Sequence, residues 1–146
     1  MSSSKLTEAL TKALADSFVL YMKTHSFHWN VKGPNFKALH DLFEEQYTEI
    51  WEATDEIAER IRAIGSYAPN NYEEMAKIAT LKPAGQTPDA DGMVQILAED
   101  NRAIVKTLIN GLKAAEEQDD EASVDLMVER IRAHEKAAWM LESSRA

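Results

Sequence analysis

The feature that most constrains this chain is a run of histidines and acids between residues 25 and 62, HSFHWNVKGPNFKALHDLFEEQYTEIWEATDEIAERIR. In this run His40 stands four residues before Glu44, and Asp55 stands four residues before Glu59. Residues four apart lie on one face of a helix. The eleven residues from Glu44 to Asp55 are close to three turns of ~3.6 residues. Both pairs therefore point in roughly the same direction from one continuous helix.

The rise of that helix limits what the two pairs can bind. At ~1.5 Å per residue, Glu44 and Asp55 lie roughly 16 Å apart along the axis, whereas metal–ligand distances are only ~2.0–2.6 Å. Either each pair belongs to a separate half-site, or a second copy of the chain supplies the missing half. Two copies laid antiparallel about a two-fold axis near residues 49–50 would bring the His40–Glu44 pair of one chain opposite the acidic pair of the other.

The donor types in these pairs indicate a class of metal. Neutral imidazole and carboxylate with open positions suit iron or another first-row divalent ion. Carboxylates four apart also occur on ordinary solvated helix faces, and a lone His28 would more often be a hydrogen-bonded core residue. However, His28 stands twelve residues before His40, and that histidine pair is in register with both acidic pairs. The combination favours a metal site over either alternative.

These residues resemble the Dps family, the mini-ferritins. The resemblance is carried by HWNVKGPNF, then LH, FE and D…AER, and it extends over nearly the whole chain to HEKAAWML. Matching positions in that family form a ferroxidase centre shared by two subunits across a two-fold axis. Many members have Asp where this chain has Glu44, whose extra methylene displaces the carboxylate. The resemblance implies an iron site of at most two ions, open to other divalent metals, with these ligands: His28, His40, Glu44, Asp55 and Glu59.

The same resemblance implies an activity and an assembly. Members oxidise Fe(II), preferentially with hydrogen peroxide and otherwise with O₂, and collect the ferric mineral inside a hollow dodecamer, which protects against oxidative stress. Iron enters such shells through an acidic pore at a three-fold axis. The matching region here contains Asp120, Asp125 and Glu129, of which Asp125 is the best match. A favourable interaction with a helix dipole would by itself explain Asp120.

The apolar spacing predicts an all-α, ferritin-like four-helix bundle in a single domain spanning residues 1–146. Apolar residues three, four or seven apart mark the helices, which are expected over about 5–32, 35–64, 88–117 and from about 120 onward. Gly33 and Gly65 are expected to end the first two helices, and Asn35 to cap the second. Residues 66–92 form a long crossover, as in ferritin-like bundles, with a short helix at 72–79 that Asn71 caps.

The composition of the chain limits which kinds of molecule it is expected to bind. The formal net charge of −9 opposes nonspecific DNA binding, which depends on neutralising phosphates. The sequence contains no run of about eighteen apolar residues, which is the length that a membrane span needs. The stretch MSSSKLTEAL lacks the apolar segment of a secretory signal. With no cysteine in the chain, disulfides and thiolate metal sites are excluded. We therefore expect a cytoplasmic iron protein with no membrane partner.

Two alternative functions make different demands on the sequence. A di-iron oxidase contained in one bundle needs Glu-x-x-His on two helices, and the residues three before the histidines are instead Met22, His25, Lys37 and Ile131. A non-enzymatic DNA-compacting protein of this family would use lysine-rich tails. The chain has only Lys5 before its first helix and Arg145 after its last, so DNA binding is expected to be weak or absent.

Four further residues near these motifs carry simpler expectations. His25 lies one turn before His28, and a supporting or surface role is expected for it rather than metal ligation. Trp29 is expected to pack beside the site, and Trp51 to lie in the core or at an interface. Asp100 interrupts the apolar stripe of the third long helix and is expected to pair with a basic residue.

Overall fold

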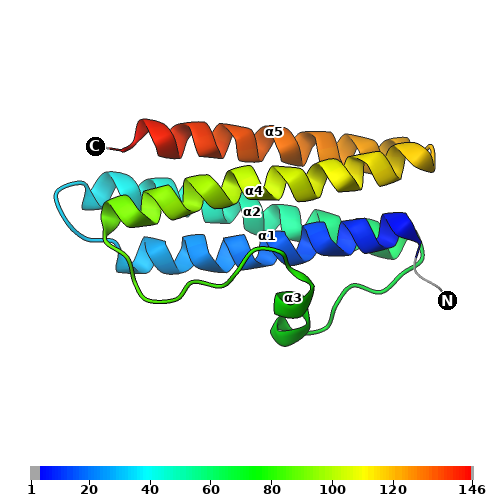
Figure 1. Ribbon diagram of the computed structural model, residues 1–146, viewed down its shortest axis with the longest axis horizontal. Coiled ribbons are helices and arrows are strands. Elements are labelled where there is room, and N and C mark those ends of the chain that lie inside the picture. Colours follow the sequence, from blue (N-terminus) through cyan, green and yellow to red (C-terminus); the bar gives the residue numbers. More distant parts are fainter. Residues whose placement is uncertain (1–3, 146) are drawn as a thin grey trace.

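The computed structural model describes residues 4–145, and this part of the chain contains five helices and no strand. Four long helices lie side by side (Figure 1): α1 (Lys5–Asn30), α2 (Phe36–Ala63), α4 (Ala90–Glu117) and α5 (Glu121–Ser143). The short helix α3 (Tyr72–Ile78) lies in the connection between α2 and α4. The predicted all-α, ferritin-like four-helix bundle with a short extra helix in its crossover is confirmed.

The direction of the helices explains the long crossover. In Figure 1, α2 and α4 run the same way, so the connection must carry the chain back along the length of the bundle. Asp16 of α1, which is fully buried, fixes that connection to the bundle. One of its carboxylate oxygens accepts the backbone N–H groups of Thr80 (2.6 Å) and Leu81 (3.0 Å). The other accepts the hydroxyls of Thr80 and Thr107, both at 2.7 Å. A buried carboxylate satisfied in this way holds the crossover in one position.

The helix ends follow the local sequence signals, with one exception. Gly33 (φ 118°) and Gly65 (φ 99°) adopt the left-handed conformation just beyond α1 and α2, as predicted for chain reversals that favour glycine. The Asn71 side chain caps α3 by accepting the N–H of Glu74 at 2.9 Å. The expected cap by Asn35 is wrong, because its backbone (φ −103°, ψ 20°) is not extended and its side chain makes no capping bond. A backbone bond from Phe36 N–H to the Gly33 carbonyl closes that turn instead.

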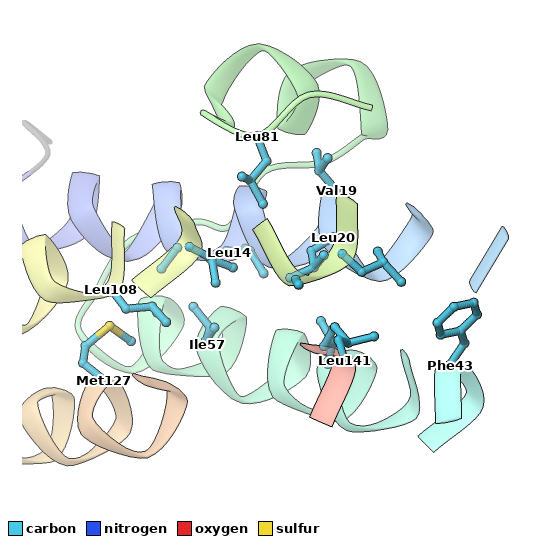
Figure 2. Close-up of a cluster of buried hydrophobic side chains, with 14 of the residues drawn as sticks. Leu14, Val19, Leu20, Phe43, Ile57, Leu81, Leu108, Met127 and Leu141 are labelled. Carbon is cyan, nitrogen blue, oxygen red and sulfur yellow. The ribbon is translucent and has the colours of Figure 1, made fainter. Parts of the chain in front are cut away.

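The core lies between the four long helices (Figure 2). Leu14 and Leu20 of α1 and Ile57 of α2 belong to this buried cluster, and Leu81 extends it from the side of the crossover, near Val19. Trp51 is not part of this core, contrary to one of its two expectations, because its side chain is 54% exposed. It follows Ile50 by one residue and so points ~100° away from that buried position. No helix in the described part of the chain is long and apolar enough to cross a membrane.

Candidate metal centre

The turn between α1 and α2 brings His28 and His40 together. Their rings stack with centroids 3.8 Å apart and an interplanar angle of 16°. Each ring is held by the backbone of the other residue. Nδ1 of His28 lies 2.7 Å from the carbonyl oxygen of His40, and Nδ1 of His40 lies 2.8 Å from the carbonyl oxygen of His28. This reciprocal pair of bonds fixes both rings relative to the helix ends.

These bonds also determine which ring nitrogen is available to a ligand. A carbonyl oxygen can only accept, so both Nδ1 atoms carry hydrogen. In the neutral ring this leaves a lone pair on Nε2. Histidines that bind metals characteristically donate their other N–H to a carbonyl or carboxylate, which fixes the tautomer and the ring orientation. The hydrogen bonds of the protein itself therefore hold His28 and His40 in the orientation and tautomer of metal ligands.

Glu44 completes a group of three donors within one chain. Its Oε1 lies 4.0 Å from Nε2 of His28, and one ligand atom from each of His28, His40 and Glu44 lies within 4.8 Å of the others. Ligands ~2.0–2.2 Å from a common ion are at most ~4.4 Å apart. The Glu44 side chain is 56% exposed, so it can make the small movement that this requires. Two imidazole nitrogens and one carboxylate can thus bind a divalent ion while leaving positions open for a reactant.

The structure does not bring Asp55 and Glu59 into this group. Both are exposed on α2, and the rise of ~1.5 Å per residue places Asp55 roughly 16 Å and Glu59 roughly 22 Å from Glu44 along the helix axis. They line a separate open hollow of about 620 Å³ between α1, α2 and the start of the crossover, which contributes Met75 of α3. The single chain therefore holds three of the five predicted ligands together, and the joint five-residue site stays a prediction.

An aromatic cluster lies beside the histidine pair and includes His25. The Tyr21 hydroxyl is 2.8 Å from Nδ1 of His25, and the His25 ring stacks on Tyr47 with centroids 3.8 Å apart. Burial lowers the pKa of His25, and the nearby His28 ring adds to that effect. The Trp29 ring lies 4.4 Å from His25, although its side chain is 57% exposed. His25 is not one of the grouped metal donors of the described chain.

Acidic side chains surround the site on the exposed face of α2. Glu44 helps to line an open hollow of about 590 Å³. The hollow is lined by Asp41, Glu44, Glu45, Thr48, Glu49 and Glu52. A surface lined by one sign of charge raises the local concentration of counter-ions, so this face attracts cations toward the histidine pair.

The three residues considered for an iron-admitting pore differ in their surroundings. The Asp120 carboxylate accepts Nη2 of Arg60 (2.9 and 3.1 Å) and caps α5 through the N–H of Ser123 (3.1 Å). Burial raises the pKa of Asp120, but the bonds from Ser123 and Arg60 outweigh that effect and keep this pKa below its usual value. Asp125 and Glu129 are exposed on α5. Asp120 thus has a structural role, and its carboxylate is less available to a passing ion.

Sequence reasoning missed a polar network in the interior of the bundle. Arg130 and His134 of α5 are each 1% exposed, as is Asn101 of α4. A signal was present in the sequence, because residues 130 and 134 fall in the same helical stripe as the buried Met127 and Leu141. Polar residues in a core stripe require partners. The expected partner for Asp100 is confirmed, since its carboxylate lies 2.7 Å from Nζ of Lys23.

Comparison with known proteins gives a consistent result. The chain matches the family described as ferritin-like domain over residues 7–144. It is 41% identical over 139 residues to DNA protection during starvation protein 2 of Bacillus anthracis, covering 95% of each chain. Its fold matches the crystal structure of Dps from Staphylococcus aureus with a TM-score of 0.93 and 35% identity, covering 99% of each chain.

A second solved structure adds a description of the wider group. The Dps protein from Vibrio cholerae is described as a member of a broad superfamily of ferritin-like diiron-carboxylate proteins. It matches with a TM-score of 0.90 and 34% identity, covering 95% of this chain and 87% of that one.

Proposed function

This chain belongs to the Dps family of ferritin-like proteins, and we propose that it oxidises Fe(II) at sites shared by two subunits and stores the ferric product inside a hollow homo-oligomer. Iron is both the substrate and the cargo in this proposal. The observation that carries it is the group of His28, His40 and Glu44, whose donor atoms lie within 4.8 Å of one another. Its expected location, the cytoplasm, is part of the same proposal.

The proposed second half of each site comes from a partner subunit. Asp55 and Glu59 repeat the four-residue spacing of His40 and Glu44 on the same helix, but they lie too far along it to share an ion within one chain. An antiparallel pairing of two α2 helices about a two-fold axis generates two identical sites. Each site then has two imidazole nitrogens from one subunit and two further carboxylates from the other. Three carboxylates per site offset most of the charge of two Fe(II) ions.

The proposed reaction balances with hydrogen peroxide as the oxidant. Two Fe(II) ions each lose one electron, and the O–O bond of one peroxide accepts both electrons and breaks. Two protons complete the two water molecules. Because both electrons are delivered to the peroxide at one site, no hydroxyl radical is released. This two-electron reduction would protect the cell against oxidative stress. O₂ is the alternative oxidant.

The proposed assembly is a dodecamer with an acidic route for iron. Asp125 and Glu129, exposed on α5, are the better candidates for lining a pore at a three-fold axis, since Asp120 is bound to Arg60.

DNA binding is the alternative function, and the charges of this chain oppose it. The net charge is −9, and both cations near the ends of the chain are paired. Lys5 lies 3.6 Å from Glu117, and Arg145 lies 3.8 Å from both Asp91 and Glu142. Phosphate contacts need several unpaired cations together, and such binding weakens steeply with salt. A saturable gel shift of plasmid DNA at about 0.15 M salt without divalent metal would make DNA a partner.

Removal of the two histidines tests the site directly. In the assembled protein with His28→Ala and His40→Ala, Fe(II) oxidation by peroxide should slow by at least ~100-fold, because both nitrogen ligands are lost. Stopped-flow absorbance of the ferric product measures the rate, and circular dichroism and size-exclusion chromatography verify folding and assembly. His25→Ala is the matched control and should keep most of the activity. Oxidation at the wild-type rate in the double variant would rule out this site.

Mixed oligomers test whether the site is shared. His40→Ala and Asp55→Ala chains should each be inactive alone. If the chains pair at random about a two-fold axis, about a quarter of the sites in a co-expressed mixture receive both intact halves, and about a quarter of the activity returns. A site confined to one chain predicts no recovery.

A further inference from the structure

The interior of the bundle holds a cation supplied by the chain itself. Arg130 of α5 is 1% exposed, and its guanidinium donates to both carboxylate oxygens of Glu49 on α2, through Nη1 to Oε2 and through Nη2 to Oε1 at 2.9 Å. The same Nη2 lies 3.0 Å from Nε2 of His134. Because arginine can only donate, Nε2 of His134 accepts this bond, and its lone pair points at the positive charge.

His134 has the tautomer and the support of a metal ligand. With Nε2 accepting, Nδ1 carries the hydrogen and donates to Oδ1 of Asn101 at 2.7 Å. Asn101 is itself held, since its Nδ2 donates to the Leu97 carbonyl at 2.8 Å. A histidine whose Nδ1–H is bound to a fixed oxygen while Nε2 faces a cation is the arrangement found around protein-bound metals. Burial, followed by the charge of Arg130, lowers the pKa of His134 to about 3, so the ring is neutral.

Two polar atoms of this region lack partners within the described chain, Oε1 of Gln46 and Nε of Arg130. Gln46, which is 8% exposed, lines a cavity of about 310 Å³ together with Glu49, Asn101 and His134. An unpaired buried amide oxygen is unusual, and amide oxygens are ligands for divalent cations. The cavity therefore offers three donor types from two facing helices: a carboxylate, an imidazole nitrogen and an amide oxygen.

We propose that Arg130 occupies a divalent-metal pocket between α2 and α5, built from the half-exposed Glu49 and the buried His134, and that its guanidinium thereby confines metal binding to the α1–α2 site. Gln46 would add a third donor, and Asn101 would orient His134. Helix bundles commonly build metal sites from side chains that project inward on facing helices. In this chain the fixed positive charge fills that position and repels a second cation. Arg130 is thus a residue that determines where the protein binds metal.

The proposed pocket is separate from the site proposed for iron oxidation. It is therefore tested in a variant that lacks the histidines of that other site. The starting protein is the assembled His28→Ala, His40→Ala variant. Arg130→Ala is added to it, and Co(II) is the probe, since its visible absorption reports ligand type and geometry. Equilibrium dialysis should show about one additional Co(II) per chain relative to the starting protein. The absorption should be that of a nitrogen- and oxygen-ligated ion.

Two matched variants separate the effect of the positive charge at residue 130 from the effect of the volume that its side chain leaves. Arg130→Lys keeps a cation on α5 and should bind no additional Co(II). Arg130→Ala combined with His134→Ala keeps the space but removes the nitrogen donor, and should lose the additional ion. Equal Co(II) binding by the Ala and Lys variants would overturn the inference, as would a folded Arg130→Ala variant that binds none.

A variant that fails to fold without metal is also informative. Arg130→Ala removes the partner of Glu49 and of His134, and this loss can unfold the chain. In that case the variant is refolded from denaturant with and without Co(II), and helical circular dichroism is measured. Recovery only with Co(II), and only while His134 is present, supports the pocket. Failure to recover with Co(II), or recovery without His134, contradicts it.

Discussion

The histidine pair between α1 and α2 and the histidine inside the bundle begin from the same local arrangement. In His28, His40 and His134, Nδ1 bonds an oxygen at 2.7–2.8 Å. They differ in what Nε2 faces. Nε2 of His28 lies 4.0 Å from the partly exposed carboxylate of Glu44, with His40 in the same donor group, whereas Nε2 of His134 accepts a bond from the guanidinium of Arg130.

The difference shows that the role of a histidine depends on the group opposite its second nitrogen. An exposed carboxylate attracts a cation to the open lone pair, so the α1–α2 pair is suited to bind metal. A buried guanidinium already supplies the cation, so His134 stabilises the fold. The same side chain is thus expected to contribute to activity at one end of the bundle and to stability at its centre.

Substitution of each histidine by alanine should give opposite results, and this is the largest effect that we expect. His134→Ala should lower the free energy of unfolding by ~2–4 kcal/mol, because it leaves a cavity and removes the partner of Asn101. His40→Ala should instead weaken Co(II) binding by at least ~100-fold. Urea denaturation at fixed protein concentration and equilibrium dialysis measure the two quantities. The comparison fails if both variants lose stability, or if both lose Co(II) binding, to the same extent.

Acid should destabilise the protein through His134. Its pKa in the folded chain is about 3, below the ordinary value of 6.5, so its contribution to stability is complete above pH 6.5 and is lost as the pH falls toward 3. At pH 5 the loss should be about 2 kcal/mol, since each unit below 6.5 costs about 1.4 kcal/mol. Urea denaturation at pH 7 and pH 5 should show this loss in the wild type and not in His134→Gln. Equal losses in the two proteins would assign the acid sensitivity to other groups.

Two neighbouring acids on α2 provide the finest test. Glu44 and Glu45 are adjacent and both exposed, but only Glu44 belongs to the donor group with the histidines. Glu44→Gln should weaken Co(II) binding about tenfold, or about 1.4 kcal/mol. Glu45→Gln removes only a nearby charge, whose effect is screened by salt, and should change Co(II) binding less than about twofold. Dialysis at two salt concentrations separates ligand loss from the general field. Similar losses in both variants would mean that the acidic face, rather than a specific ligand, binds the ion.

The sequence by itself determined the helices, their glycine stops and the spacing of the metal donors. These features depend on residues one to four apart, where the geometry of a helix fixes the neighbours. His40 and Glu44 could therefore be placed on one face before any fold was known. The axial distance from Glu44 to Asp55 likewise follows from the rise per residue, and it limits one chain to half of the predicted site.

Only the tertiary structure decided how side chains on different helices meet. The reciprocal bonds of His28 and His40, and the contact of Arg130 with Glu49 across the bundle, depend on the rotation and axial offset of packed helices. A shift of one residue turns a side chain by ~100°, and the apolar pattern does not define packing to that precision. For the same reason the sequence left Trp51 either in the core or at an interface, and the structure excludes the core. Helix periodicity identifies which residues face inward, but the partner of each buried polar group is set by the packing of the whole bundle.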